Sequence, residues 1–265
     1  MKKTAVLLSL LLAACDAPAS TAPSAGVSSA AATPSEAPAA APMDVGPPKV
    51  DAVHEYTGGA KAGDSLPMIV AIHGLGDAPQ SFKGLLAGFP AKAHVVFPAG
   101  GVAWGDGFAW WPIRGSIDEK NMAEGIGAAA ERLAEGIRSW QDGAVVGKPI
   151  VTGFSQGGML SFALGVTYPA EIGEAFPIAG LLPPSMVPPA WPAGAPMPRF
   201  VALHGDADQR VPYSLGQRSV TLLQGLGLAA ELRSYPGMAH TISADMRRDL
   251  FELLTAAVSR AGKPG

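Results

Sequence analysis

Residues 149–158 have the sequence Pro149-Ile150-Val151-Thr152-Gly153-Phe154-Ser155-Gln156-Gly157-Gly158, and this stretch decides the fold. An apolar run typical of a buried strand leads into Gly-Phe-Ser-Gln-Gly, which matches the pattern G-x-S-x-G. Residues 156–168, which follow, are apolar on nearly all sides, as in a helix buried against a sheet. A serine on a sharp turn between strand and helix needs small neighbours, and glycines supply them here. The stretch therefore predicts a nucleophile elbow with Ser155 at its tip.

Four further apolar runs predict the other strands of a sheet. None alternates apolar with polar residues, which favours strands buried on both faces, as in a parallel sheet. The runs are Met68–Ile72, Ala93–Phe97, Glu174–Ala179 and Arg199–Leu203. Pro177 argues against the third run as a central strand, because proline cannot donate to a sheet ladder.

Segments with helical periodicity lie between the runs. Residues 118–140 and 241–258 each place apolar side chains three and four positions apart, which gives one apolar stripe per helix. Alternating strands and helices predict an α/β fold: one domain with a mainly parallel, doubly wound sheet flanked by helices. Residues 181–198 hold seven prolines and predict an irregular loop between two strands. The sequence leaves open whether this loop covers the site.

The first 48 residues are predicted to lie outside the folded domain. Residues 1–14 combine a basic start with an apolar run that is too short to span a bilayer, as in a signal peptide. Leu12-Ala13-Ala14-Cys15 resembles the bacterial lipobox, which implies cleavage before Cys15 and lipid attachment to it. Residues 15–48 are rich in Ala, Pro and Ser and predict a disordered tether. The α/β domain is expected over residues 49–262, outside the cytoplasm and anchored to a bacterial membrane, with simple secretion as the alternative.

Composition excludes several classes of function. The net charge is −3, or about −5 once Lys2 and Lys3 are removed with the signal, and no run of Lys or Arg exists. Nucleic-acid binding therefore has no electrostatic support. Cys15 is the only cysteine, so no thiol is left in the domain for a nucleophile or a metal cluster. We expect neither a metal nor another cofactor.

A serine hydroxyl needs a base, and the base needs an acid that orients it. In this type of fold the chain order is Ser, acid, His. His204 and His240 are the two histidines after Ser155, and His240 lies in a loop before the last predicted helix, where the base is expected. For the acid, both Asp206 and Asp208 lie in the loop that follows a late strand, and the residues alone do not choose between them.

Two further segments are expected to line the site. His73-Gly74-Leu75-Gly76-Asp77 directly follows the run 68–72 and has the small residues of an oxyanion turn. We expect the N–H groups of Leu75 and Gln156 to form the oxyanion hole, and His73 to hold the loop rather than act as the base. Trp104, Trp110 and Trp111 lie in the Gly-rich stretch after residues 93–97. They are candidates for substrate binding, with core packing as the alternative for each.

Taken together, these motifs resemble the phospholipase/carboxylesterase family, which includes the acyl-protein thioesterases. The resemblance rests on residues 72–77, on residues 153–158, on His204-Gly205-Asp206-Ala207-Asp208 with Val211-Pro212, and on His240. It implies that Asp208 is the acid of a Ser-His-Asp triad. Trp110-Trp111-Pro112 stands where the family carries Trp-Phe-Asp, so the resemblance says little about the substrate.

The expected function is that of a serine carboxylic-ester hydrolase working through an acyl-enzyme, similar to carboxylesterases and lysophospholipases. The expected partners are a small-molecule or lipid ester substrate and a membrane held through Cys15. One alternative is an esterase that removes acetyl or feruloyl groups from polysaccharides. Another is a surface-anchored binding protein without catalytic activity.

Overall fold

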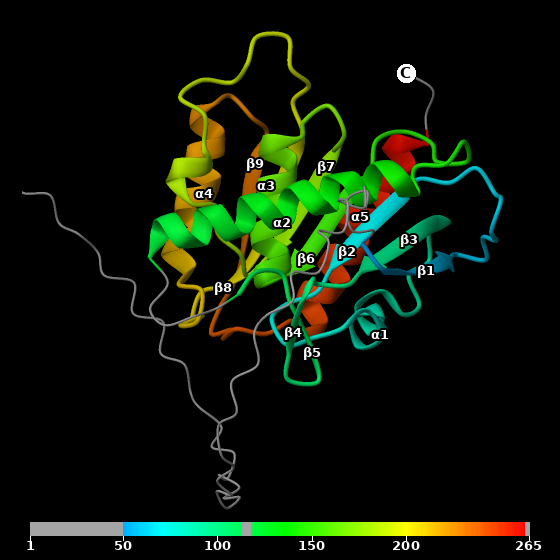
Figure 1. Ribbon diagram of the computed structural model, residues 1–265, viewed down its shortest axis with the longest axis horizontal. Helices are drawn as coiled ribbons and strands as arrows, with labels where there is room; N and C mark the ends of the chain where they lie inside the picture. The colour runs from blue at the N-terminus through cyan, green and yellow to red at the C-terminus, as the bar shows by residue number, and fades with distance from the viewer. Residues whose placement is uncertain (1–49, 113–117, 263–265) are drawn as a thin grey trace, which may run out of the picture. The chain divides into compact units, whose positions relative to one another are not determined.

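The computed structural model describes residues 50–112 and 118–262. Its main sheet has seven strands in the order β1-β3-β2-β6-β7-β8-β9 (Figure 1). The strands are β1 (Ala52–Thr57), β2 (Met68–Ile72), β3 (Ala93–Pro98), β6 (Ile150–Phe154), β7 (Glu174–Ile178), β8 (Arg199–Gly205) and β9 (Ala230–Tyr235). Only the edge strand β1 runs antiparallel to its neighbour. The predicted fold class, an α/β fold with a mainly parallel sheet, is confirmed.

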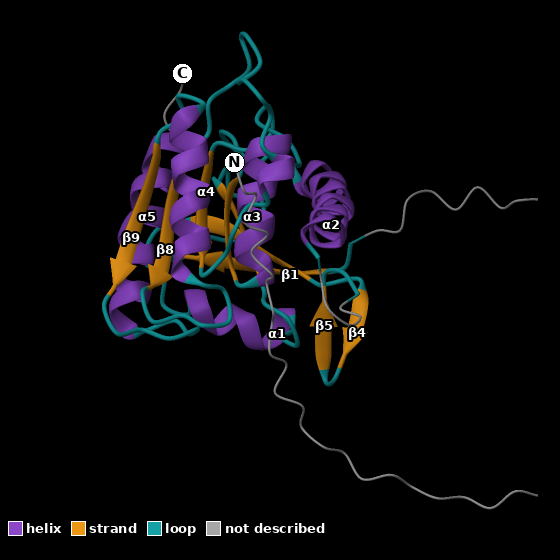
Figure 2. Cartoon of the chain, turned by 90° about the vertical axis from the view of Figure 1, so that its left-hand side faces the viewer, coloured by secondary structure: helices purple, strands orange, loops and turns teal. Residues whose placement is uncertain are grey.

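Helices cover both faces of the sheet (Figure 2). One face carries α2 (Glu119–Trp140), α3 (Gln156–Thr167) and α4 (Tyr213–Gly225), whose apolar side chains share one core. The other carries the short helix α1 (Pro79–Phe82), the 3₁₀ turn η1 (Lys83–Leu86) and α5 (Ala244–Ala261), which share a second core. A sheet buried on both faces explains why β2 is apolar throughout and why β3 is apolar except at His94.

The two long amphipathic helices begin at side-chain caps and bury the predicted stripes. The Asp118 carboxylate accepts the Asn121 N–H before α2, and the Ser243 hydroxyl accepts the Met246 N–H before α5. Buried stripe residues on α2 are Met122, Ile126, Ala130, Leu133 and Ile137, and those on α5 are Met246, Leu250, Leu253, Leu254 and Ala257. By contrast, α3 is buried on all sides, as expected for the helix that follows the elbow.

The five predicted strands all form, including the one that contains Pro177. Gly153 of β6 pairs with Pro177, but the register between β7 and β8 holds at Glu174, Ala175 and Ile178 and skips the two residues between them. The sheet thus accommodates the missing N–H of proline as a local interruption of one ladder. Strands β1 and β9 and helix α4 were not predicted. The two strands mix buried and exposed positions, and α4 buries few large apolar side chains.

The Pro-rich loop 181–198 contains one 3₁₀ turn, η2 (Pro184–Met186), and is otherwise irregular. It ends where β8 begins, and Arg199 pairs there with Glu174, the first residue of β7. The end of the loop therefore lies at the amino edge of the sheet, whereas Ser155 follows the carboxyl end of β6. The second half of the loop is therefore not in a position to cover Ser155.

A short hairpin stands at the carboxyl edge of the sheet, formed by β4 (Val102–Trp104) and β5 (Gly107–Ala109) (Figure 1). An isolated bridge joins Asp77, in the turn after β2, to Phe108 in β5. The hairpin is therefore attached to the predicted oxyanion turn rather than to the main sheet.

The predicted signal peptide (1–14), lipidation site (Cys15) and tether (15–48) lie outside the described residues. Among the helices that are described, none has both the length and the apolar character needed to cross a bilayer.

Candidate active site

Ser155 lies on a strained turn between β6 and α3. Its φ of 56° and ψ of −113° place a non-glycine residue at positive φ, a conformation that costs free energy and persists only where surrounding contacts impose it. The Ser155 N–H donates to Ile178 O at 2.9 Å, which fixes the turn to β7. A Cβ on Gly157 would lie 2.0 Å from Ile72 O, so only glycine permits this approach of α3 to β2. These contacts account for the small residues of the motif.

Three side chains from three different loops meet at this turn. His240 Nε2 lies 2.9 Å from Ser155 Oγ, and His240 Nδ1 lies 2.7 Å from Asp208 Oδ2. Because an ionised carboxylate can only accept, Nδ1 carries the proton and Nε2 is left to accept the hydrogen bond of the hydroxyl. The Phe154 ring packs against the imidazole with 4.7 Å between ring centroids. The structure thus brings together the three residues predicted as nucleophile, base and acid.

Asp208 is buried, yet it remains ionised. Burial by itself raises the pKa of this carboxyl, but hydrogen bonds from His204, His240 and the Val211 N–H outweigh burial and hold the pKa well below its usual range. Oδ1 accepts the backbone N–H groups of Arg210 and Val211 at 2.9 and 3.0 Å. A carboxylate held in this way can stabilise an imidazolium at His240.

A second histidine, for which the sequence predicted no role, lies beside this carboxylate. His204 is 1% exposed, and its Nε2 lies 2.8 Å from Val211 O and 3.4 Å from Asp208 Oδ2. Because a carbonyl oxygen only accepts, Nε2–H is the donor. The i,i+4 spacing of His204 and Asp208 was visible in the sequence, but that spacing alone does not show that a loop residue turns back onto a strand end.

Asp206, the other candidate acid, has a different role in the structure. Its Oδ1 accepts the Gly237 N–H at 2.7 Å, and the residue is exposed. It therefore fixes the loop that leads to His240 and does not contact the imidazole. The choice of Asp208, which the family resemblance implied, agrees with this geometry.

The turn after β2 is held by the buried ring of His73. Nδ1 lies 2.7 Å from Gly74 O, and Nε2 accepts the Gly100 N–H at 3.0 Å, so both ring nitrogens are engaged within the fold. Burial lowers the pKa of His73, against the opposing effects of the Gly74 carbonyl and Asp77. A neutral ring bonded on both sides fits the expected loop-fixing role.

The N–H groups of Leu75 and Gln156, the expected oxyanion donors, lie on the two segments that flank Ser155. A Cβ on Gly74 would lie 3.5 Å from Ser155 Cβ, which places the turn against the nucleophile. Within residues 50–112 and 118–262, neither N–H donates to a protein acceptor. Gln156 is also the first residue of α3, where free N–H groups and the helix dipole favour negative charge.

The three tryptophans predicted to contact substrate have different environments. Trp110 and Trp111 are 2% and 6% exposed and pack in the core beneath α2. Trp104 is partly exposed on the hairpin, with its ring against Gly76 of the oxyanion turn. Burial favours core packing for the first two, so Trp104 is the one aromatic of this set that is open to a ligand.

In the part of the chain that the structure describes, this site lacks a metal-binding cluster and lies apart from a groove on α5. Among the described residues, no three His, Cys, Asp or Glu side chains converge as metal binding would require. A groove of about 610 Å³ lies on the outer side of α5, next to Pro90 and Phe251. It contains none of the predicted site residues.

The geometry around Ser155 has the elements of acyl transfer: an oriented hydroxyl, an imidazole bonded to it, a buried carboxylate and two N–H groups without a protein acceptor in the described residues. A model of one protein family, described as Phospholipase/Carboxylesterase, matches residues 60–257. The chain belongs to the phospholipase/carboxylesterase family. Membership makes it a serine hydrolase that acts on ester bonds, as predicted.

Individual relatives agree with this placement. The chain is 28% identical over 216 residues to acyl-protein thioesterase 1 of Mycosarcoma maydis, covering 71% of this chain and 89% of the relative. The solved structure of esterase PE8 superposes with a TM-score of 0.69 at 21% identity, covering 79% of this chain and 99% of that one. Zea mays acyl-protein thioesterase 2 gives 0.63 at 24% identity, covering 79% and 99%. Both solved structures share the fold of this chain.

Proposed function

We propose that this protein hydrolyses carboxylic esters through an acyl-enzyme formed on Ser155. His240 Nε2 takes the hydroxyl proton as Ser155 Oγ attacks the ester carbonyl, and Asp208 stabilises the resulting imidazolium. His240 then protonates the leaving alcohol. A water molecule repeats the sequence on the acyl-enzyme and releases the acid. The observation that carries the proposal is the chain of hydrogen bonds from Ser155 Oγ through His240 to Asp208, at 2.9 and 2.7 Å.

The oxygen of the tetrahedral intermediate is proposed to bind the N–H groups of Leu75 and Gln156. Both N–H groups are backbone donors on segments that contacts with the fold hold in place, so they do not have to reorganise as charge develops. Loss of one such donor typically lowers the rate about 10²–10³-fold.

The test compares the wild-type protein with Ser155→Ala and with Ser259→Ala. Ser259 is an exposed serine on α5 whose hydroxyl bonds only to its own helix, which makes it a matched control. We expect the wild type and Ser259→Ala to hydrolyse p-nitrophenyl acetate and to be labelled by a fluorophosphonate probe. Ser155→Ala should lose at least about 10⁴-fold in kcat and all labelling. If the wild type shows neither reaction, the catalytic proposal is wrong and a binding function replaces it.

The acyl and alcohol groups are the finer part of the proposal. We propose short or medium acyl esters, of the carboxylesterase or lysophospholipase kind, because Trp104 is the only predicted aromatic that a ligand can reach among the described residues. The test is a panel of p-nitrophenyl esters of increasing chain length, a thioester of matched acyl group, a lysophospholipid, acetylated xylan and methyl ferulate. A marked preference for acetylated xylan or the feruloyl ester would favour the polysaccharide-directed alternative.

We also propose that the enzyme is lipidated at Cys15 and held outside the cytoplasm, with residues 15–48 as its tether. The support is the lipobox-like Leu12-Ala13-Ala14-Cys15 after a signal-like apolar run. Cys15→Ser should move the protein from the membrane fraction to the soluble fraction, or block its processing. A variant that is processed normally and remains on membranes would contradict lipid anchoring.

A further inference from the structure

Trp110 joins the two segments that carry the proposed oxyanion donors. Its indole Nε1–H donates to His73 O at 2.9 Å, in the turn that presents the Leu75 N–H. Its backbone N–H donates to Gln156 Oε1 at 3.0 Å, at the start of α3. One residue is therefore bonded to both halves of the hole.

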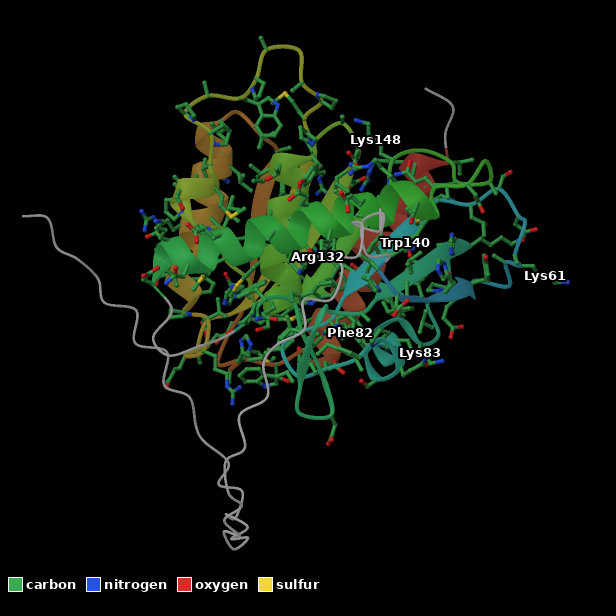
Figure 3. The ribbon with its side chains drawn as sticks, in the orientation of Figure 1. Lys61, Phe82, Lys83, Arg132, Trp140 and Lys148 are labelled. Carbon is green, nitrogen blue, oxygen red and sulfur yellow. The ribbon has the colours of Figure 1, made fainter. Side chains whose placement is uncertain are left out.

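The third polar group of Trp110 is also bonded. Arg132, labelled in Figure 3, projects from α2 and donates from Nη2 to Trp110 O at 3.0 Å. Trp110 is 2% exposed, and the centroid of its ring lies 4.9 Å from that of the His73 ring. Every polar group of Trp110 thus serves a different element, and water does not compete for these bonds.

Packing by an apolar ring does not account for this arrangement. A phenylalanine or leucine would fill much of the same volume, but it would leave the His73 carbonyl without this donor. Since the Leu75 N–H lies two residues beyond that carbonyl, the orientation of the peptide at residue 73 affects where the donor points. Gln156 Nε2, by contrast, is buried without a partner in the described part of the chain, so the side chain of Gln156 is oriented through its oxygen alone.

We propose that Trp110 is a positioning residue that sets the geometry of the oxyanion hole through its indole N–H. The inference rests on the proposed function, because the hole matters only if Ser155 forms a tetrahedral intermediate. Trp110 is buried and is bonded to none of the triad side chains, and it acts through the peptide of His73 and the side chain of Gln156. Its effect is therefore on the transition state and not on substrate binding.

The experiment compares Trp110→Phe with Trp140→Phe and with a protein carrying 3-benzothienylalanine at position 110. Trp140 is another buried tryptophan, 9% exposed, at the far end of α2, so its replacement removes the same atoms away from the site. Benzothienylalanine keeps the fused ring but has sulfur in place of the N–H. For each protein, kcat and KM for p-nitrophenyl acetate, the rate of fluorophosphonate labelling and the Tm are measured.

Both changes at position 110 should lower kcat and the labelling rate about 10-fold, less than the loss of a whole donor, with KM changed less than about 2-fold. Trp140→Phe should lower Tm and leave kcat as in the wild type. If the benzothienylalanine protein retains wild-type kcat, or if KM alone rises, Trp110 has a packing or binding role and the inference is wrong. An inactive wild type would instead refute the proposed function.

Discussion

The site has two halves that are built by different means. On the triad side, the side chains of Ser155, His240 and Asp208 meet through hydrogen bonds between their own functional groups. On the oxyanion side, backbone groups are presented. Beside the side-chain bonds of His73 and Trp110, backbone bonds place them: Gly76 N–H to Phe108 O at 2.8 Å and Phe108 N–H to Asp77 O at 2.9 Å.

This difference separates two kinds of sensitivity to mutation. The triad depends on which functional groups are present, so a change of one atom type at fixed shape should abolish it. The oxyanion side depends on where the chain runs, so it should tolerate changes of side chains other than His73 and Trp110 and fail when two backbones are pushed apart. Matched pairs of substitutions in each half can test this distinction.

Among the substitutions that test this distinction, Asp208→Asn is expected to have the largest effect. The amide would place an NH₂ group against either His240 Nδ1–H or the backbone N–H groups of Arg210 and Val211, all of which are donors. His240 would then adopt the wrong tautomer, and kcat should fall about 10⁴-fold with little change in KM. The measurement is steady-state hydrolysis of p-nitrophenyl acetate.

Asp206→Asn is the matched control. The amide oxygen can still accept the Gly237 N–H, so kcat should stay within about 3-fold of the wild type. Equal losses in the two variants would mean that the chemistry does not distinguish the two carboxylates, and the assignment of Asp208 as the acid would have to be withdrawn.

A smaller effect is expected on the oxyanion side, from Gly107→Ala. The added Cβ would lie 2.4 Å from Gly76 O and 2.7 Å from Asp77 O, so the hairpin and the oxyanion turn must separate. We expect kcat to fall about 10-fold, below the effect of losing a donor outright, because the turn is displaced but keeps its N–H groups.

Gly101→Ala tests the same substitution close by in the chain. There the nearest atoms to the added Cβ belong to the flexible Arg132 side chain at 3.9 Å, an ordinary contact. Its kcat should match that of the wild type. If Gly107→Ala is equally active and has a normal Tm, the hairpin does not determine the geometry of the hole.

The sequence predicted the triad side better than the oxyanion side for the same physical reason. Catalytic side chains are restricted to a few residue types, so Ser155 in its elbow and His240 before the last helix could be found by pattern and chain order. A backbone N–H is carried by every residue except proline, and the sequence marks its position only through nearby glycines. Trp110 shows the limit, because an indole N–H bonded to a carbonyl 37 positions earlier leaves no local pattern.

The elements of the fold also differ in how well the sequence predicts them. Strands buried on both faces, such as β2 and β6, have continuous apolar sequences and were predicted with nearly their observed bounds. The edge strand β1 mixes buried and exposed positions, and its partner β3 lies about 40 residues further along the chain, so only the tertiary structure defines it. The hairpin β4–β5 is too short for a periodicity to emerge.

The smallest effect concerns a pair of histidines outside both halves of the site. His54 Nδ1 on β1 lies 2.9 Å from His94 Nε2 on β3, and the two rings stack with 5.1 Å between centroids. Burial lowers the pKa of both rings, and the charge of His54 lowers that of His94 further, against an opposing effect of Asp142. The unfolded chain therefore binds more protons than the folded chain below about pH 6.5, the ordinary pKa of histidine.

The free energy of unfolding is consequently expected to decrease as the pH falls from about 6.5 toward the lowered pKa values. Above that range the two histidines no longer reduce it. His54→Gln removes one of the two titrating rings and the repulsion that its charge exerts on His94. Its plot of Tm against pH between 7 and 5 should be flatter than that of the wild type, by a few degrees at most, since about 1 kcal/mol changes Tm by about 2–4 °C in a domain of this size. Parallel plots would show that the acid sensitivity arises elsewhere, with the buried His73 of the oxyanion turn, whose pKa burial also lowers, as the next group to test.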